Sequence, residues 1–398
     1  MKTRVFLLAL VILLACTIIF TACNSNNTSS DNNNTQENSE NVENDESNQN
    51  SNNSNNLLNT PLAHRVENGT CIITGIGSYT DSKLIIPSKI DDVPVVAISE
   101  GAFKDCKQIQ ELYLPASVTN VGELAFNGCS NITKIDIESL SIWCNNNFGA
   151  QFDDGYANGY DSASLYINGV SAEEITIPED VKTVPKYCFQ NFINIKKIII
   201  PSHVTKIESS AIWECLNLEF IYIAPSITEV EYYSIIDSDS CTVLKYANIP
   251  FCVANNIFFN SVIRPENLET LIINSGNGAI DDFAFDECKK LKNLIILSAS
   301  DIGYCAFSDC RKLSTVILSD SIEQIGPSAF KGCVRLENVY LGSGLTDIEN
   351  NVFYECEKLE KIYYNGNSEK WSNIVIDGLG TDVTIYFNTK QPDWETIQ

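Results

Sequence analysis

The chain has 398 residues, of which 44% are hydrophobic and 19% charged, enough for one or two ordinary domains with tails. Its formal net charge is -25 at pH 7. A charge of that sign repels phosphate backbones and anionic lipid surfaces, and the sequence has no basic stripe, so we expect no nucleic-acid partner.

Residues 1–23 have the order of an export signal. A short basic start precedes an apolar run over residues 5–20, and Thr21-Ala22-Cys23 leads into a polar segment. Small residues before a cysteine at this boundary resemble the lipobox of bacterial lipoproteins. The resemblance implies lipidation of Cys23, which anchors the chain to the cell membrane with the rest outside. Cys16 is an alternative lipidation site, and an uncleaved anchor also stays open, although about 16 apolar residues are slightly short for a span.

Residues 24–56 consist almost wholly of Asn, Ser, Thr, Gln, Glu and Asp. They include six acidic residues and no Lys or Arg. Such a segment cannot bury enough apolar area to offset chain entropy. We expect a disordered tether with a span of about 30 Å.

Two patterns recur in phase through the rest of the chain. The phrase Ala-Phe-x-x-Cys, with variants, has phenylalanines 22 or 23 residues apart within two runs, at Phe103, Phe126, Phe285, Phe307, Phe330 and Phe353. A Leu-x-x-Leu-x-Leu motif follows each Cys position, as over residues 109–114 and 195–200, and predicts a short strand. A fixed step of this size predicts a solenoid whose coils each contain a strand, a turn, a second short strand and an aromatic corner.

These motifs resemble the BspA-like leucine-rich repeats of bacterial surface proteins. The fullest match is Ile325-Gly326-Pro327-Ser328-Ala329-Phe330 followed by Cys333, and the resemblance covers about residues 68–387. It implies an α/β repeat solenoid dominated by β-structure, a right-handed superhelix with a parallel sheet on one face and about 23 residues per repeat. We expect an N-terminal cap over 57–97, repeats over 98–362, and a C-terminal cap and tail over 363–398.

The largest departure from the repeat is an insertion near residues 139–174, between Phe126 and Phe189. Insertions in solenoids often alter a binding surface. We therefore predict ligand contacts by Trp143, Tyr156 and Tyr160. The acidic run over 153–161 lacks EF-hand spacing, and we interpret it as a turn rather than a calcium site. A bent coil is expected over residues 232–257, where the repeat phrase is lost.

Thirteen cysteines follow Cys23. Those in the repeat phrase occupy inward positions, which predicts a stacked column of reduced thiols rather than a disulfide framework. Six others lie outside that column, at Cys71, Cys144, Cys188, Cys241, Cys252 and Cys305. The chain has no C-x-x-C pair and two histidines, His64 and His203, which give little support to a zinc site or a Cys-His nucleophile. We expect no metal, no cofactor and no enzyme activity.

Strand register predicts a possible binding surface. Residues between the last two core positions of each strand point away from the core. The predicted ligand contacts in this row are Tyr113, Ile199, Tyr222, Ile272, Ile295, Ile317, Tyr340 and Tyr363. Asp136 and Lys245 complete the row. An exposed apolar row marks a binding surface, but such residues also suit strands for packing reasons or lie beneath a loop, so both interpretations stay open.

The sequence as a whole favours a non-catalytic, adhesin-like surface protein. It would bind an extracellular protein or glycan, on host matrix or on another bacterium, through the sheet face. Two alternatives stay open: a structural envelope spacer that self-assembles, and a hydrolase with an unrecognised site.

Overall fold

The structure is a computed structural model that describes residues 61–146, 148, 162–231, 234–235, 243–254, 265–374, 379 and 382–392. Contacts divide the chain into residues 1–56 and 57–398, and every described residue belongs to the second unit. Cys23, the predicted export signal and tether, and Tyr156 and Tyr160 of the insertion lie outside the described residues.

A small sheet opens the described chain. Strands β1 (Ala63–Glu67) and β2 (Thr70–Gly75) form an antiparallel hairpin, turned by Asn68 and Gly69 with φ of 51° and 76°. β5 (Val93–Ile98) pairs with β2 in parallel, with β4 (Lys89–Ile90) in antiparallel fashion, and with β7 (Asn120–Val121) in parallel. This segment therefore mixes hairpins with the first coil.

The principal sheet begins with four parallel strands in chain order, which we call the first stack: β3 (Lys83–Ile85), β6 (Glu111–Leu114), β8 (Lys134–Ile137) and β9 (Ser164–Ile167). β10 (Val170–Ser171) then folds back antiparallel to β9.

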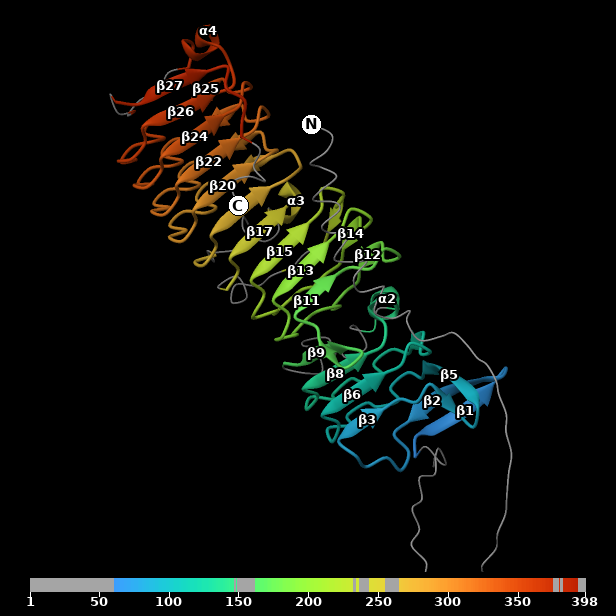
Figure 1. The fold of residues 1–398 in the computed structure, drawn as a ribbon. Coiled ribbons are helices and arrows are strands. Elements are labelled where there is room, and N and C mark those ends of the chain that lie inside the picture. The colour runs from blue at the N-terminus through green and yellow to red at the C-terminus, as the bar shows by residue number, and fades with distance from the viewer. Residues whose placement is uncertain are drawn as a thin grey trace, which may run out of the picture. The chain divides into compact units, whose positions relative to one another are not determined.

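A ten-stranded parallel sheet follows, which we call the second stack (Figure 1). Its strands are β11 (Glu174–Thr176), β13 (Lys197–Ile200), β15 (Phe220–Ile223), β17 (Tyr246–Ile249), β18 (Thr270–Ile273), β20 (Asn293–Ile296), β22 (Thr315–Leu318), β24 (Asn338–Leu341), β26 (Lys361–Tyr364) and β27 (Thr384–Phe387). Each strand pairs in parallel with the next coil, so the predicted β-solenoid is confirmed.

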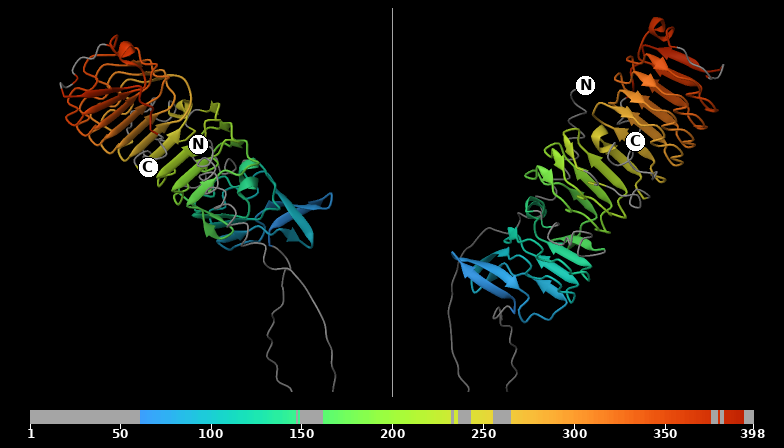
Figure 2. Two further views of the ribbon diagram at one scale, coloured as in Figure 1. Left: turned by 45° about the horizontal axis from the view of Figure 1, so that its top comes forward. Right: turned by 180° about the vertical axis from the view of Figure 1, so that it is seen from behind.

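Shorter parallel strands run along another side of the coils (Figures 1 and 2). They are β12 (Thr183–Val184), β14 (Lys206–Ile207) and β16 (Glu229–Val230), and then β19 (Ala279–Ile280), β21 (Asp301–Ile302), β23 (Gln324–Ile325) and β25 (Asp347–Ile348). The described part of the chain contains three short helices: α2 (Leu140–Asn145), α3 (Phe251–Ala254) and α4 (Ser368–Trp371). Within the described ranges, no helix has the length and apolar character needed to cross a membrane.

The core of each coil is built from the repeat phrase. The buried rings of Phe285, Phe307, Phe330 and Phe353 stack in sequence, with centroids 5.2, 5.5 and 5.8 Å apart and nearly parallel planes. Five repeat cysteines donate their thiols to the carbonyl of a phenylalanine in the preceding coil, as Cys333 does to Phe307 at 3.3 Å; they are Cys129, Cys215, Cys310, Cys333 and Cys356. Small, weakly polar Cys thus fits a tight corner that also offers a buried acceptor. The inward column predicted for the repeat cysteines is confirmed.

The two stacks meet at a break in the principal sheet, because β10 pairs with β9 and the next sheet starts at β11. The side-chain amide of Asn194 bridges this break. Its Oδ1 accepts from the Leu165 amide at 2.9 Å, and its Nδ2 donates to the Leu165 carbonyl at 2.7 Å. One side chain therefore pairs with both backbone groups of Leu165, whose carbonyl also accepts from the Ala172 amide at 2.9 Å.

Helix α2 fills the same junction, and it corrects one prediction. Ser139 caps the helix by accepting from the Ile142 amide at 3.2 Å. Trp143 lies within α2 and is 1% exposed, with its Nε1 donating to the Cys188 carbonyl at 2.9 Å and its ring packed on Phe192. The prediction of Trp143 as a ligand contact is wrong, because its large ring fills the space between the two stacks.

Candidate binding surface on the sheet face

The outward positions of the principal sheet form a row in which each residue pairs with its equivalent in the next coil. In the first stack the row is Ile85, Tyr113, Asp136 and Tyr166. In the second stack it includes Ile199, Tyr222, Asn248, Ile272, Ile295, Ile317, Tyr340, Tyr363 and Tyr386. The predicted register is therefore confirmed for all eight proposed contact positions.

One position of the row was predicted wrongly. Asn248, not Lys245, pairs with Tyr222 and Ile272. The core positions of this coil are Leu244, Ala247 and Ile249, all fully buried. A small alanine at the middle position hid the Leu-x-x-Leu-x-Leu pattern, and Lys245 instead forms an ion pair with Glu219 at 2.7 Å.

Sequence reasoning also missed three members of the row, Ile85, Tyr166 and Tyr386. Their signals are the alternations Leu84-Ile85-Ile86, Leu165-Tyr166-Ile167 and Ile385-Tyr386-Phe387, each of which lacks a full repeat phrase beside it. Period-2 alternation alone would have been enough to place them on the outer face of a strand.

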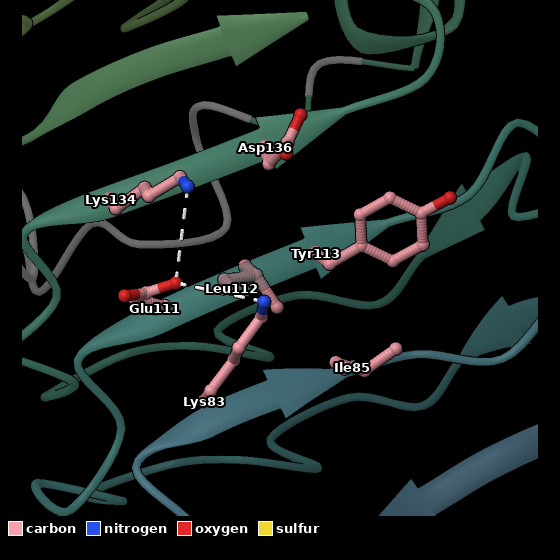
Figure 3. A pocket seen from close by; sticks show the side chains of 7 residues that line it. All are labelled: Lys83, Ile85, Glu111, Leu112, Tyr113, Lys134 and Asp136. Atoms are coloured by element: carbon pink, nitrogen blue, oxygen red, sulfur yellow. Dashed lines mark ion pairs between the residues drawn. The ribbon is translucent and has the colours of Figure 1, made fainter. Parts of the chain in front are cut away.

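A pocket of about 320 Å³ lies on the face of the first stack (Figure 3). It is lined by Lys83, Ile85, Glu111, Leu112, Tyr113, Lys134 and Asp136. Figure 3 shows Lys83 and Lys134 directed toward Glu111 from the strands on either side, and each Nζ lies 4.0 Å from Glu111 Oε2. Two cations and two carboxylates balance in this pocket, which suits a polar ligand with charges of both signs.

The tyrosine in this pocket is held by a hydrogen bond. The Tyr113 hydroxyl donates to the Glu138 carboxylate, which also accepts from the Ala116 amide at 2.8 Å. The bond to Glu138, assisted by burial, raises the pKa of Tyr113 to about 12. The Ala116 amide, together with the Tyr113 hydroxyl, lowers the pKa of Glu138. The ring is therefore oriented by two strands before any ligand arrives.

The middle of the second stack is closed. Ile272, Ile295 and Ile317 point outward but are 0%, 1% and 1% exposed, and they form a small apolar cluster with Tyr246, Leu297 and Tyr340 packed against it. A covered side chain cannot touch a ligand unless its cover moves. We therefore correct these three from predicted ligand contacts to packing residues. Of the two interpretations of the row, the covered one holds at this point.

The carboxyl-terminal end of the row carries a ladder of stacked tyrosines. Tyr340 and Tyr363 have centroids 4.6 Å apart at 10°, and Tyr363 and Tyr386 have centroids 5.2 Å apart at 19°. Stacking uses the ring faces against each other, so the ring edges and hydroxyls are what the ladder offers to a ligand. Tyr386, in the last strand, is 41% exposed.

The remaining predicted contacts, Ile199 and Tyr222, lie half-buried at the start of the second stack. Beside them, Phe220 and Tyr246 stack with centroids 4.4 Å apart and planes 1° apart. Burial raises the pKa of Tyr222, and the neighbouring Tyr246 adds to that shift. The Phe220–Tyr246 pair therefore packs ring on ring between the neighbouring strands β15 and β17.

Both histidines lie within hydrogen-bond distance of backbone carbonyls. His203 Nε2 lies 2.8 Å from the Pro178 carbonyl, and His64 Nδ1 lies 3.0 Å from the Leu62 carbonyl. In the part of the chain that the structure describes, no group of three or more His, Cys, Asp or Glu side chains could hold a metal ion.

Fold and surface together define a leucine-rich repeat β-solenoid that carries an aromatic and charged sheet face. The family model for the BspA type leucine rich repeat region matches residues 79–151, 162–242 and 255–378 of this sequence, in six copies. The chain belongs to this family of repeat proteins.

Several solved structures resemble the chain. A leucine-rich repeat protein from Bacteroides ovatus is 20% identical, with 83% of this chain and 99% of that chain covered and a TM-score of 0.35. A leucine rich cell surface protein from Faecalibacterium prausnitzii is 18% identical, with coverages of 81% and 97% and a TM-score of 0.35. A leucine-rich repeat protein from Eubacterium ventriosum is 18% identical, with coverages of 83% and 93% and a TM-score of 0.27. A search of curated proteins finds no match.

Proposed function

We propose that the chain is a non-catalytic, adhesin-like protein of the bacterial cell surface that binds a protein partner through its sheet face. The observation that carries the proposal is the ladder of Tyr340, Tyr363 and Tyr386, whose rings are stacked and whose hydroxyls and edges line one face. Rigid tyrosines supply contact area and hydrogen bonds at low entropy cost, as in protein-binding loops.

A protein partner fits this ladder better than a glycan. A sugar ring that stacks on an aromatic side chain needs an open ring face, and here the faces of Tyr340 and Tyr363 are packed on their neighbours. Edges and hydroxyls suit backbone and side-chain groups of a protein instead. The charge-balanced pocket of the first stack, with Lys83, Glu111 and Lys134, adds positions for complementary charges that set specificity.

The amino-terminal segment completes the proposal. An export signal that ends at a lipidated Cys23, followed by a polar tether over 24–56, would hold the solenoid outside the cell membrane. The binding role requires no metal, cofactor or bond-breaking step.

The experiment compares variants of the full chain on an array of host matrix proteins, bacterial surface extracts and glycans. Replacing Tyr340, Tyr363 and Tyr386 by Ser should weaken binding to a protein spot at least tenfold, since the tyrosines are the proposed anchors. Replacing all three by Phe keeps the stacked rings and tests the hydroxyls alone. Tyr354→Ser is the matched control, because Tyr354 is exposed but lies on the corner side of its coil, next to Phe353.

All variants must first show the same circular dichroism spectrum and melting temperature. Saturable binding that the Ser variant keeps would remove the sheet-face proposal. Binding confined to glycan spots would replace the protein partner by a sugar. Self-association without any ligand would favour the structural spacer.

A further inference from the structure

Two cysteines meet at the junction between the stacks. Cys144 lies in α2, after the third strand of the first stack, and Cys188 lies at the corner of the first coil of the second stack. Their Sγ atoms are 3.5 Å apart, and both side chains are buried. The pair is 44 residues apart in sequence.

Both cysteines depart from the repeat. Cys188 stands immediately before Phe189, where most other coils have an alanine, such as Ala211 and Ala306. Cys144 belongs to α2, which follows β8 as α3 follows β17 and α4 follows β26, whereas the repeat phrase itself contains no helix. Five repeat cysteines direct their thiols to backbone carbonyls, as Cys215 does to Phe189 at 3.0 Å, whereas the thiols of Cys144 and Cys188 are directed at each other. The pair therefore belongs to the junction and not to the column.

The surroundings of the pair hold it in place. The Trp143 indole donates to the Cys188 carbonyl at 2.9 Å. Trp143, which precedes Cys144, is therefore fixed to the backbone of Cys188. On the exposed side of α2, the Asn145 amide donates to Asp180 at 2.9 Å. A disulfide needs the sulfurs at about 2.05 Å, so the two Sγ atoms would have to approach from their present 3.5 Å.

We propose that Cys144 and Cys188 are a disulfide site that joins the two stacks covalently at the break in the sheet. The oxidant is a disulfide, of the class of oxidised glutathione or a thiol oxidase. One cysteine thiolate attacks it to form a mixed disulfide and releases one thiol, and the second cysteine then displaces the other thiol. Two cysteine thiols lose two protons and two electrons, and the oxidant is reduced to two thiols.

Packing and compartment set when this reaction takes place. Burial, together with Cys144, raises the pKa of the Cys188 thiol, so its thiolate is scarce once the junction is packed. The bond therefore forms while the junction is still open, during folding. An oxidising compartment is where such a bond persists, and in this respect the inference rests on the proposed location outside the cell.

The test supplies the oxidant directly, so its outcome does not depend on export or on ligand binding. The full chain is unfolded under reducing conditions and refolded with a mixture of oxidised and reduced glutathione, and free thiols are then alkylated in denaturant. Mass spectrometry should find two thiols fewer than in the reduced protein and a peptide pair joined through Cys144 and Cys188. The melting temperature should be several degrees higher than that of the reduced protein, because the bond constrains a long loop.

Cys188→Ala is the decisive variant, since it introduces the alanine that most other coils have at this position and should therefore fold. It should retain Cys144 as a free thiol and lose the oxidant-dependent rise in melting temperature. The column variant Cys310→Ala should still form the joined peptide pair and still show the rise in melting temperature. Complete alkylation of Cys144 and Cys188 after refolding would overturn the proposal, as would a joined peptide pair that contains column cysteines instead. Because the readout is thiol mass, a protein that binds nothing on the array can still pass this test.

Discussion

The two stacks of the solenoid share one core and differ on the surface. Inward positions of both are filled by Leu, Ile, Val and Phe. On the sheet face, the first stack presents Lys83, Glu111 and Lys134 around a pocket, whereas the second presents buried isoleucines and then stacked tyrosines. A repeat scaffold thus keeps its shape while its outward positions vary, and function must be sought in those positions.

The second stack and the junction differ in regularity. Four phenylalanines stack in sequence in the second stack, and at the junction Phe192 stands where a repeat cysteine is expected. The junction is held instead by side-chain hydrogen bonds from Asn194 and Trp143 and by backbone hydrogen bonds of Ala163 with Asn191 and Ile193. Stability should therefore be spread along the second stack and concentrated in a few bonds at the junction.

The largest effect is expected from Phe307→Ala in the second stack. Phe307 is fully buried and stacks on both Phe285 and Phe330. Truncation removes the ring and leaves a cavity, which should lower the free energy of unfolding by about 4 kcal/mol. Urea titration measures the change. Phe283→Ala is the matched control, because Phe283 is 47% exposed and its loss should cost about 1 kcal/mol or less. Equal losses of unfolding free energy for both variants would mean that the stacked phenylalanines do not stabilise the coils.

A smaller effect is expected from Asn194→Ala at the junction. The change leaves the Leu165 amide without its acceptor, while the Leu165 carbonyl keeps its bond from the Ala172 amide, and the cost should be about 1 to 3 kcal/mol. Hydrogen exchange should show the loss at the Leu165 amide. Asn217→Ala is the control, because Asn217 makes one bond, to the Ile193 carbonyl, on an exposed turn of the regular second stack. Unchanged exchange at Leu165 would show that the amide bridge does not hold the junction.

The smallest effect is a pH dependence in the first stack. The pKa of Tyr113 is raised from 10.0 to about 12, so its contribution to stability is complete below pH 10 and is lost as pH rises through about 12. The pKa of Glu138 is lowered from 4.5, so its contribution is present above pH 4.5 and is lost as pH falls through the folded value.

Tyr113→Phe removes the hydrogen bond from the hydroxyl to Glu138 and tests both the alkaline and the acidic loss of stability. The variant should be less stable than the parent by about 1 kcal/mol or less at pH 7, since the pair is partly exposed to solvent. That difference should shrink toward pH 12 and again below pH 4.5, as measured by urea titration across this range. Tyr166→Phe, in the same row, should show no such dependence on Glu138. A difference that stays constant from pH 4 to 12 would contradict the assigned bond.

Much of the fold followed from periodicity. The step of the Ala-Phe-x-x-Cys phrase placed the phenylalanine ladder and the inward cysteines, and period-2 alternation placed Tyr113, Tyr222 and Tyr340 on the outer face. Where the pattern weakened, prediction failed: Ala247 in a core position led to Lys245 being placed outward in the position that Asn248 holds. Local patterns report only the direction of a side chain from its own coil.

The sequence by itself therefore determined the coil, its step, and which side chains point inward, because these depend on residues a few positions apart. The tertiary structure decided what lies over and beside those side chains. Ile295 is buried, the ring of Tyr363 stacks on the tyrosines on either side of it, and Trp143 is buried beside Cys188. Burial and stacking arise from contacts between coils and across an insertion, and such contacts have no fixed sequence spacing from which they could be predicted.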